Sequence, residues 1–86
     1  MGRAPRYIPK YLGQKLAKVR KGLGIETYDE MIARLEVKEV KLHRATVLKY
    51  EQGKLEPPSI VLLRYAKLAG ATIDDLVDDT KELPRK

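Results

Sequence analysis

The chain has 86 residues, 43% of them hydrophobic, which is enough for one compact core and too few for a second domain with a core of its own. It contains no cysteine and a single histidine, His43, so the sequence offers neither a disulfide framework nor the ligands of a zinc centre. The longest apolar run, residues 60–63, is far shorter than the roughly 20 residues that cross a bilayer, so we expect no membrane partner and a cytoplasmic protein.

The positive charge of the chain is concentrated in its first two thirds. The net charge is +6, but residues 1–54 carry 13 Lys or Arg against 6 Asp or Glu, whereas residues 55–86 carry 5 against 6. This asymmetry suits a protein that contacts a polyanion with one side, because neutralising phosphates drives association with nucleic acids. Taken alone, the charge is explained equally well by a solvated basic surface without a partner.

The first nine residues predict a flexible basic arm, and a helix follows it. The arm, residues 1–9, holds two arginines and too few apolar residues to fold alone. Apolar residues then recur at spacings of four, three and four, which indicates an amphipathic helix from about residue 10 to residue 21. This stripe consists of Leu12, Leu16, Val19 and Leu23. Gly22 and Gly24 are expected to end the helix.

A capping signal predicts a second helix over residues 28–35. Thr27 and Glu30 have the spacing of a capping box, in which the threonine hydroxyl accepts from the amide of Glu30 and the carboxylate accepts from the amide of Thr27. The expected inward residues are Met31, Ile32 and Leu35. The next stretch, residues 36–42, has mixed charge and alternating valines, and its pattern leaves both a continued helix and an irregular connection open.

Residues 43–52 predict a third helix with two chemically different faces. At about 3.6 residues per turn, Val47, Tyr50 and Glu51 fall on one side. The other side holds Ala45, Leu48, Lys49 and Gln52, and Arg44 and Thr46 flank the two. The helix is expected to end at Gly53, because glycine readily takes the left-handed conformation that follows a helix.

Two more helices are predicted in the remaining chain. After a pair of prolines, residues 60–69 are apolar nearly all round, which is typical of a buried central helix. Gly70 closes it, and Thr72 is expected to cap a short final helix that brings Leu76 and Val77 back onto the core.

The sum of these elements is an all-α domain of five helices with no convincing strand. We expect it to span residues 10–79 and to be followed by a short tail, residues 80–86, that frays. The paired aspartates at positions 74–75 and 78–79 suit helix capping and solubility better than metal binding, because they lie on or beside one short helix.

A dispersed set of residues completes the pattern. It comprises Leu16, Arg20, Ile25, Thr27, then Thr46-Val47-x-Lys49-Tyr50-Glu51-x-Gly53-Lys54, then Pro57, Leu62-Leu63, Ala66, Gly70, Asp74 and Leu76. With these residues the stretch 12–77 resembles the lambda-repressor-like, or XRE-type, helix-turn-helix family of five-helix DNA-binding domains. The resemblance implies that the third helix lies in the major groove and that the second crosses the DNA backbone.

The resemblance also implies roles for individual residues. Base contacts fall to Arg44, Ala45 and Lys49, with Thr46 a further candidate. Phosphate contacts fall to Tyr28, His43, Gln52 and Lys54. Arg20 and Glu51 match a structural salt bridge that is partly buried in several family members.

The chemistry of these side chains supports their assignment to base readout. Arg44 can pair bidentately with guanine, and Lys49 can do the same or take a phosphate. The methyl group of Ala45 can touch a thymine methyl, as can Leu48, although we favour an ordinary surface role for Leu48.

The chain departs from the family between its second and third helices. Residues 36–42 add about five residues and contain no glycine, where the family turns within a few residues around one. The insertion leaves the angle between the helices open. It can lengthen the second helix, form a loop that touches DNA through Lys38 or Lys41, or remain a solvated loop.

Together these observations favour a binding protein and no enzyme. The sequence has no set of residues that assembles into a catalytic site, a metal cluster or a phosphate-binding glycine loop, so we expect no cofactor and no small-molecule ligand. The leading hypothesis is a sequence-specific binder of double-stranded DNA, a repressor-like transcriptional regulator, acting as a homodimer through its fourth and fifth helices. The alternative is a protein-protein interaction module, such as an antitoxin-like adaptor, with the same fold.

Overall fold

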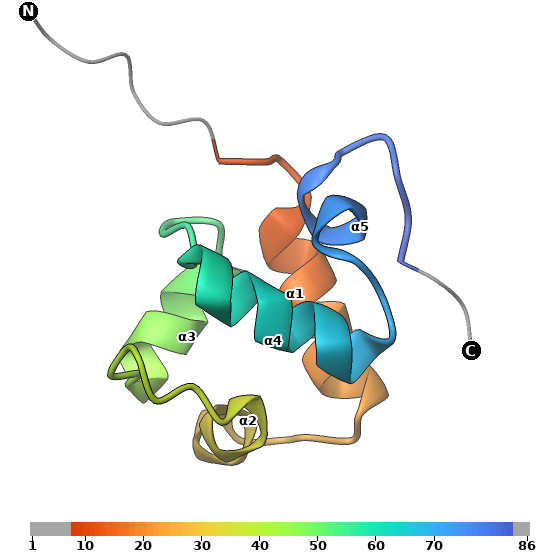
Figure 1. Cartoon of the computed structure of the whole chain (residues 1–86). Coiled ribbons are helices and arrows are strands. Elements are labelled where there is room, and N and C mark those ends of the chain that lie inside the picture. Colours follow the sequence, from red (N-terminus) through yellow and green to blue (C-terminus); the bar gives the residue numbers. More distant parts are fainter. Residues whose placement is uncertain (1–7, 84–86) are drawn as a thin grey trace, which may run out of the picture.

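The computed structural model describes residues 8–83, so most of the predicted arm and the last three residues lie outside the described part of the chain. This part contains five α-helices and no strand, which confirms the all-α prediction (Figure 1). The helices are α1 (Leu12–Gly22), α2 (Tyr28–Leu35), α3 (Arg44–Glu51), α4 (Ser59–Ala69) and α5 (Ile73–Val77). Their bounds differ from the predicted ones by at most two residues.

Local side-chain chemistry sets the starts of two helices. At α2, the hydroxyl of Thr27 accepts from the amide of Glu30 at 3.2 Å, but the reciprocal bond of the predicted capping box is not among the hydrogen bonds of the described residues. At α5, both halves of a capping box form between Thr72 and Asp75, at 3.2 and 3.0 Å. The cap therefore explains why so short a helix begins where it does.

The connection between α2 and α3 is irregular. Helix α2 ends at Glu36, whose backbone is left-handed with φ of 52°, and α3 begins only at Arg44. This excludes a lengthened second helix. Glycine is the residue that takes such a conformation without strain, and none is present here. Val37 and Leu42 pack against the core, so the connection is held at two points.

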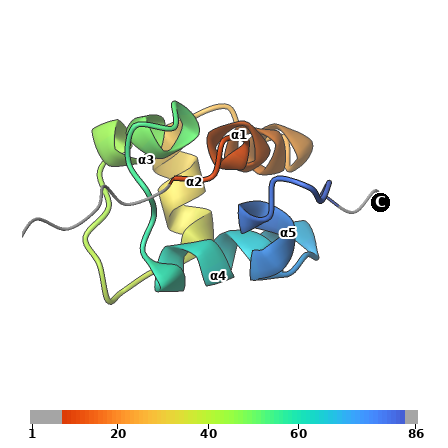
Figure 2. The same ribbon diagram turned by 90° about the horizontal axis from the view of Figure 1, so that it is seen from above.

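Helices α1 and α4 each pack against three other helices. Helix α1 packs against α3, α4 and α5, and α2 packs against α3 and α4. Helix α2 is seen nearly end on in Figure 1 and runs down the page in Figure 2, where α3 lies at one end of it and α4 at the other. Helices α2 and α3 therefore cross at a steep angle.

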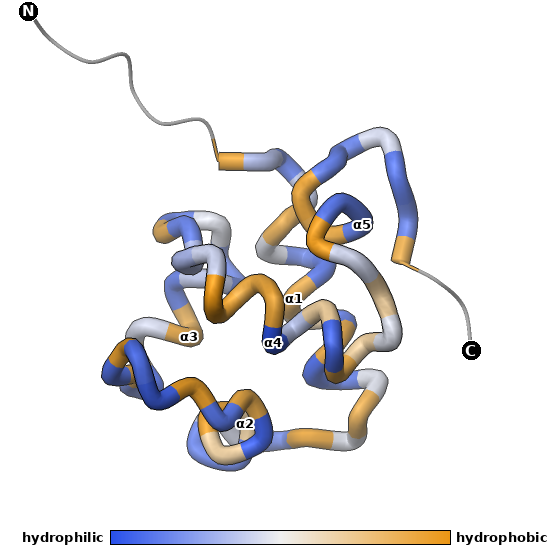
Figure 3. The backbone as a smooth tube through the Cα atoms, viewed as in Figure 1, coloured by the Kyte–Doolittle hydropathy of each residue, from blue (hydrophilic) through white to orange (hydrophobic). Residues whose placement is uncertain are grey.

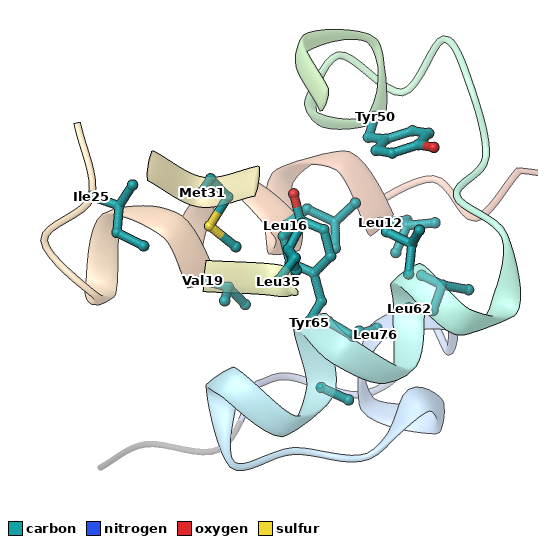
Figure 4. Packing of buried hydrophobic residues seen from close by; sticks show 12 residues of the cluster. Leu12, Leu16, Val19, Ile25, Met31, Leu35, Tyr50, Leu62, Tyr65 and Leu76 are labelled. Atoms are coloured by element: carbon teal, nitrogen blue, oxygen red, sulfur yellow. The ribbon is translucent and has the colours of Figure 1, made fainter. Parts of the chain in front are cut away.

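The core draws side chains from every helix, as Figure 4 shows. Its fully buried members include Leu12, Leu16, Ile25, Met31, Leu35, Val61, Tyr65 and Leu76. Helix α4 is less completely buried than its sequence predicts. The apolar run at its start is the orange stretch in Figure 3, yet Leu63 in that run is 37% exposed, because a helix against one core has one face left for solvent.

Tyr65 places a hydroxyl inside this core. The residue has no exposed surface, and its hydroxyl has no hydrogen-bond partner in the described structure. Burial, and after it the negative charge of Glu51, raises the pKa of the Tyr65 phenol far above its usual value of 10.0. Burial also raises the pKa of Tyr50.

The segment after α5 is tied to the first helix. Lys15, only 6% exposed, donates from Nζ to the carbonyl oxygens of Asp75 at 2.7 Å and Asp78 at 2.8 Å. The carboxylate of Asp79 accepts from the amides of Lys10 and Tyr11 at the start of α1, both at 3.0 Å. Lys15 thereby satisfies the carbonyl oxygen of Asp75 in the last turn of α5, and Asp79 satisfies backbone amides just before α1.

Two further contacts concern the predicted tail and arm. Leu83, within the stretch 80–86 assigned to the tail, packs against the core cluster. Pro9, the last residue of the predicted arm, is buried, whereas residues 1–7 lie outside the described part of the chain.

Gly13 marks the closest approach of α1 to the end of α3. A Cβ atom at this position would lie 2.6 Å from the carbonyl oxygen of Glu51 and 2.9 Å from the amide nitrogen of Gly53. Both are backbone atoms, which cannot rotate away as a side chain can. The packing of α3 on α1 therefore requires a glycine here.

We predict that Gly13→Ala destabilises the protein by about 1–3 kcal/mol, because the added methyl overpacks a backbone contact. Gly22→Ala is the matched control in the same helix, since a Cβ there meets nothing within 4 Å. Alanine favours helix over glycine by up to about 1 kcal/mol, so this variant should be as stable as the wild type or more so. Urea denaturation measures both, and equal stability of the two variants contradicts the close approach.

We predict a second effect at alkaline pH. Because folding raises the pKa of Tyr65, its neutral phenol contributes stability that is complete below the unfolded pKa of about 10 and is lost as the pH rises above it. Above pH 10 the wild type should therefore lose about 1.4 kcal/mol per pH unit more than Tyr65→Phe. At neutral pH the variant should be at least as stable, because it removes a buried hydroxyl without an acceptor. Urea denaturation of both proteins from neutral pH to above pH 10 tests this. If the two free energies of unfolding change in parallel with pH, the prediction is wrong.

Candidate nucleic-acid interface

The two faces predicted for α3 are present in the structure. Val47 is fully buried and Tyr50 is 3% exposed, so the inner face belongs to the scaffold. The outward face is exposed at Arg44, Ala45, Leu48, Lys49 and Gln52, and Thr46 is half-buried at its edge. Every base-contact candidate except Thr46 is thus fully accessible from one side of the molecule.

An ion pair with two hydrogen bonds holds α3 on α1, as predicted. Arg20 Nε donates to Glu51 Oε2 at 2.8 Å, and Nη2 donates to Oε1 at 3.1 Å. Nη1 donates to the carbonyl oxygen of Ile25 at 3.0 Å. The side chains are 12% and 6% exposed, so the pair is nearly buried. The hydrogen bond to Glu51 is the largest cause that raises the pKa of Arg20.

Tyr28, the first residue of α2, contacts the same guanidinium. Its ring lies under Arg20, with 5.0 Å between the guanidinium carbon and the ring centroid, and the side chain is half-buried. This is a cation-π distance. Tyr28 therefore has a structural role in addition to the phosphate contact predicted for it.

The starts of α2 and α3 lie side by side. Arg44 Nε is 3.5 Å from Asp29 Oδ1, and these side chains are 72% and 68% exposed. A pair so exposed contributes little to stability, so Arg44 can exchange Asp29 for another partner at small cost. Asp29 is not among the site residues predicted from the sequence. Its contact with Arg44 joins two helices and has no local sequence signal.

The remaining phosphate candidates lie at the two ends of α3. His43 occupies the N-cap position without a side-chain hydrogen bond to the helix, and it is exposed. Gln52 follows the helix at its other end, and Lys54 comes after Gly53, whose φ of 74° ends the helix as predicted. The first amides of α3 have no hydrogen-bond partner within the helix, which makes this end suited to an anion.

The connection before α3 adds charge to the same region. Lys38 and Lys41 are exposed, and Glu39 between them is also exposed, with its carboxylate accepting from the amide of Lys38 at 3.1 Å. The contact between this loop and DNA stays a prediction.

Comparison with known proteins does not identify a family for this chain. No protein-family model, no curated protein and no solved structure matches the chain. Within residues 8–83 no group of three or more side chains is placed to hold a metal ion. No helix in this part of the chain has both the length and the apolar character needed to cross a membrane.

We predict that Arg20→Ala and Glu51→Ala each destabilise the protein by about 3–5 kcal/mol, because each leaves a poorly solvated charge without its partner. The double variant should lose much less than the sum of the two losses. Urea denaturation of all four proteins at neutral pH gives the coupling free energy between the two side chains. Additive losses contradict a direct interaction.

Proposed function

We propose that this chain binds double-stranded DNA sequence-specifically, as a repressor-like transcriptional regulator that places α3 in the major groove. The observation that carries the proposal is that the two faces of α3 differ. Its inner face is anchored by a nearly buried ion pair, and its outward face is exposed and basic. An α-helix fits the major groove, and a rigidly held helix keeps its side chains in register with the bases.

Base readout is assigned to Arg44, Ala45 and Lys49, with Thr46 at the edge. The exposed guanidinium of Arg44 has donors for a bidentate contact with guanine, and its weak pair with Asp29 is easily exchanged for such a contact. Ala45 brings no hydrogen-bonding group and suits the methyl group of thymine.

Phosphate contacts are assigned to Tyr28 at the start of α2 and to His43, Gln52 and Lys54 at the ends of α3. Two helix starts then face the same strand, and their amides supplement the side chains. Such contacts position the protein without reading the sequence.

We also propose that two copies bind as a homodimer through α4 and α5. A single α3 reads few base pairs, and binding to two half-sites one helical turn apart is the usual solution. Leu63 on α4 is exposed, and Ile73 and Val77 on α5 are half-buried, so both helices offer apolar surface for a partner.

We predict that Arg44→Ala weakens binding to a selected duplex by about 1–3 kcal/mol and relaxes the base preference at one position. Lys49→Ala should weaken binding either at one position or uniformly, depending on whether it contacts a base or a phosphate. The duplex comes from selection in a random pool, and fluorescence anisotropy measures the affinity. Lys81→Ala is the control, because this exposed lysine lies after α5.

Salt dependence distinguishes this function from a protein-binding module. The logarithm of the DNA affinity should fall with the logarithm of salt concentration at a slope of about −0.9 for each phosphate neutralised. If the wild type shows no affinity for any duplex even at low salt, the proposal is wrong and the protein-binding alternative takes its place. Unchanged affinity and preference in Arg44→Ala and Lys49→Ala would refute the assigned readout.

A further inference from the structure

A small basic pocket lies between the end of α2 and the middle of α4. It has a volume of about 180 Å³ and is lined by Arg34, Leu35, Glu36, Arg64, Lys67 and Leu68. Arg64 and Lys67 are three residues apart on α4, so they project from the same face of the helix. With Arg34 from α2, the pocket is lined by three cationic side chains and one carboxylate, that of Glu36.

Arg64 carries a donor that the fold does not use. Its Nε is withdrawn from solvent and has no hydrogen-bond acceptor within the described residues. Arg20 differs from Arg64 in this respect, because its Nε and Nη2 donate to the two oxygens of the Glu51 carboxylate. A buried donor without an acceptor is unfavourable, so an incoming oxyanion would remove an existing penalty.

The position of the pocket separates it from the candidate DNA surface. Asp29 contacts Arg44 at the start of α2, whereas the pocket is formed where α2 ends. Figure 2 shows α3 and α4 at opposite ends of α2. A duplex lying on the outward face of α3 therefore meets the other end of α2, and the pocket is left for a different ligand.

The lining of the pocket favours a carboxylate on an aliphatic stem over the backbone of a nucleic acid. Leu35 and Leu68 supply apolar walls beside the cations, which suit the methylene groups of a glutamate or aspartate side chain. Arginine's planar fork matches a carboxylate with two hydrogen bonds.

We propose that this pocket binds a carboxylate side chain from an acidic segment of a protein partner. Arg64 takes the carboxylate with its guanidinium after a rotation of the side chain that exposes Nε, and Lys67 and Arg34 neutralise its charge and that of neighbouring acidic residues. The site does not depend on DNA binding by α3, so one chain can hold DNA at one end of α2 and an acidic protein segment at the other.

The test is an NMR titration of the full chain with a tetraglutamate peptide, with tetraglutamine as the uncharged comparison. We expect tetraglutamate to cause saturable amide shifts centred on residues 34–36 and 64–68, and tetraglutamine to cause none. Arg64→Met keeps the length of the stem and removes the donors, and it should weaken binding at least tenfold. Lys81→Ala, outside the pocket, should bind tetraglutamate like the wild type.

Stability and DNA binding complete the experiment. Arg64→Met should fold at least as stably as the wild type, because no internal partner is lost, and its affinity for the selected duplex should be unchanged. Tetraglutamate shifts spread evenly over all basic residues, or shifts that Arg64→Met leaves intact, would overturn the proposal. A weaker duplex affinity in Arg64→Met would also overturn it, by assigning the pocket to the nucleic-acid surface or to the dimer contact proposed for α4. Failure of duplex binding in every variant would bear only on the function proposed for α3.

Discussion

The ion pair between Arg20 and Glu51 is the interaction on which the placement of α3 depends. It joins the last turn of α1 to the last turn of α3 with two hydrogen bonds, and the same guanidinium bonds the carbonyl oxygen of Ile25 before α2. The ring of Tyr28 lies against it, so three helices are connected through one side chain. Gly13 permits this arrangement, because only a residue without Cβ lets the backbones approach so closely.

This anchoring divides the chemistry of α3. Val47, Tyr50 and Glu51 hold α3 against the rest of the fold. Its outward side chains are therefore not needed for packing and are available for recognition. The two half-buried arginines of the domain show the same division. Arg20 has every polar group engaged by the fold, whereas Arg64 has a buried donor that the fold leaves unused.

The sequence was a good guide to features that depend on near neighbours. The cap at Thr27, the turn at Gly53 and the inward face at Val47 follow from spacing along one helix, and the pair between Arg20 and Glu51 came from family resemblance. Contacts across the fold escaped prediction, because Lys15 and Asp78, or Gly13 and Glu51, are distant in sequence and carry no periodic signal. The prediction of a full capping box at Thr27 was wrong, because only one of its two hydrogen bonds forms. The prediction that α4 is buried on all sides was wrong at Leu63, which faces solvent.

The central claim is that the outward face of α3 meets DNA while the rest of the fold holds it still. The most direct measurement is an NMR map of backbone amide shifts on adding a duplex selected from a random pool. The account predicts large shifts over residues 43–54 and at the start of α2, with α5 unaffected except where two copies meet. Shifts confined to the end of α2 and the middle of α4, or no shifts at low salt, would contradict it.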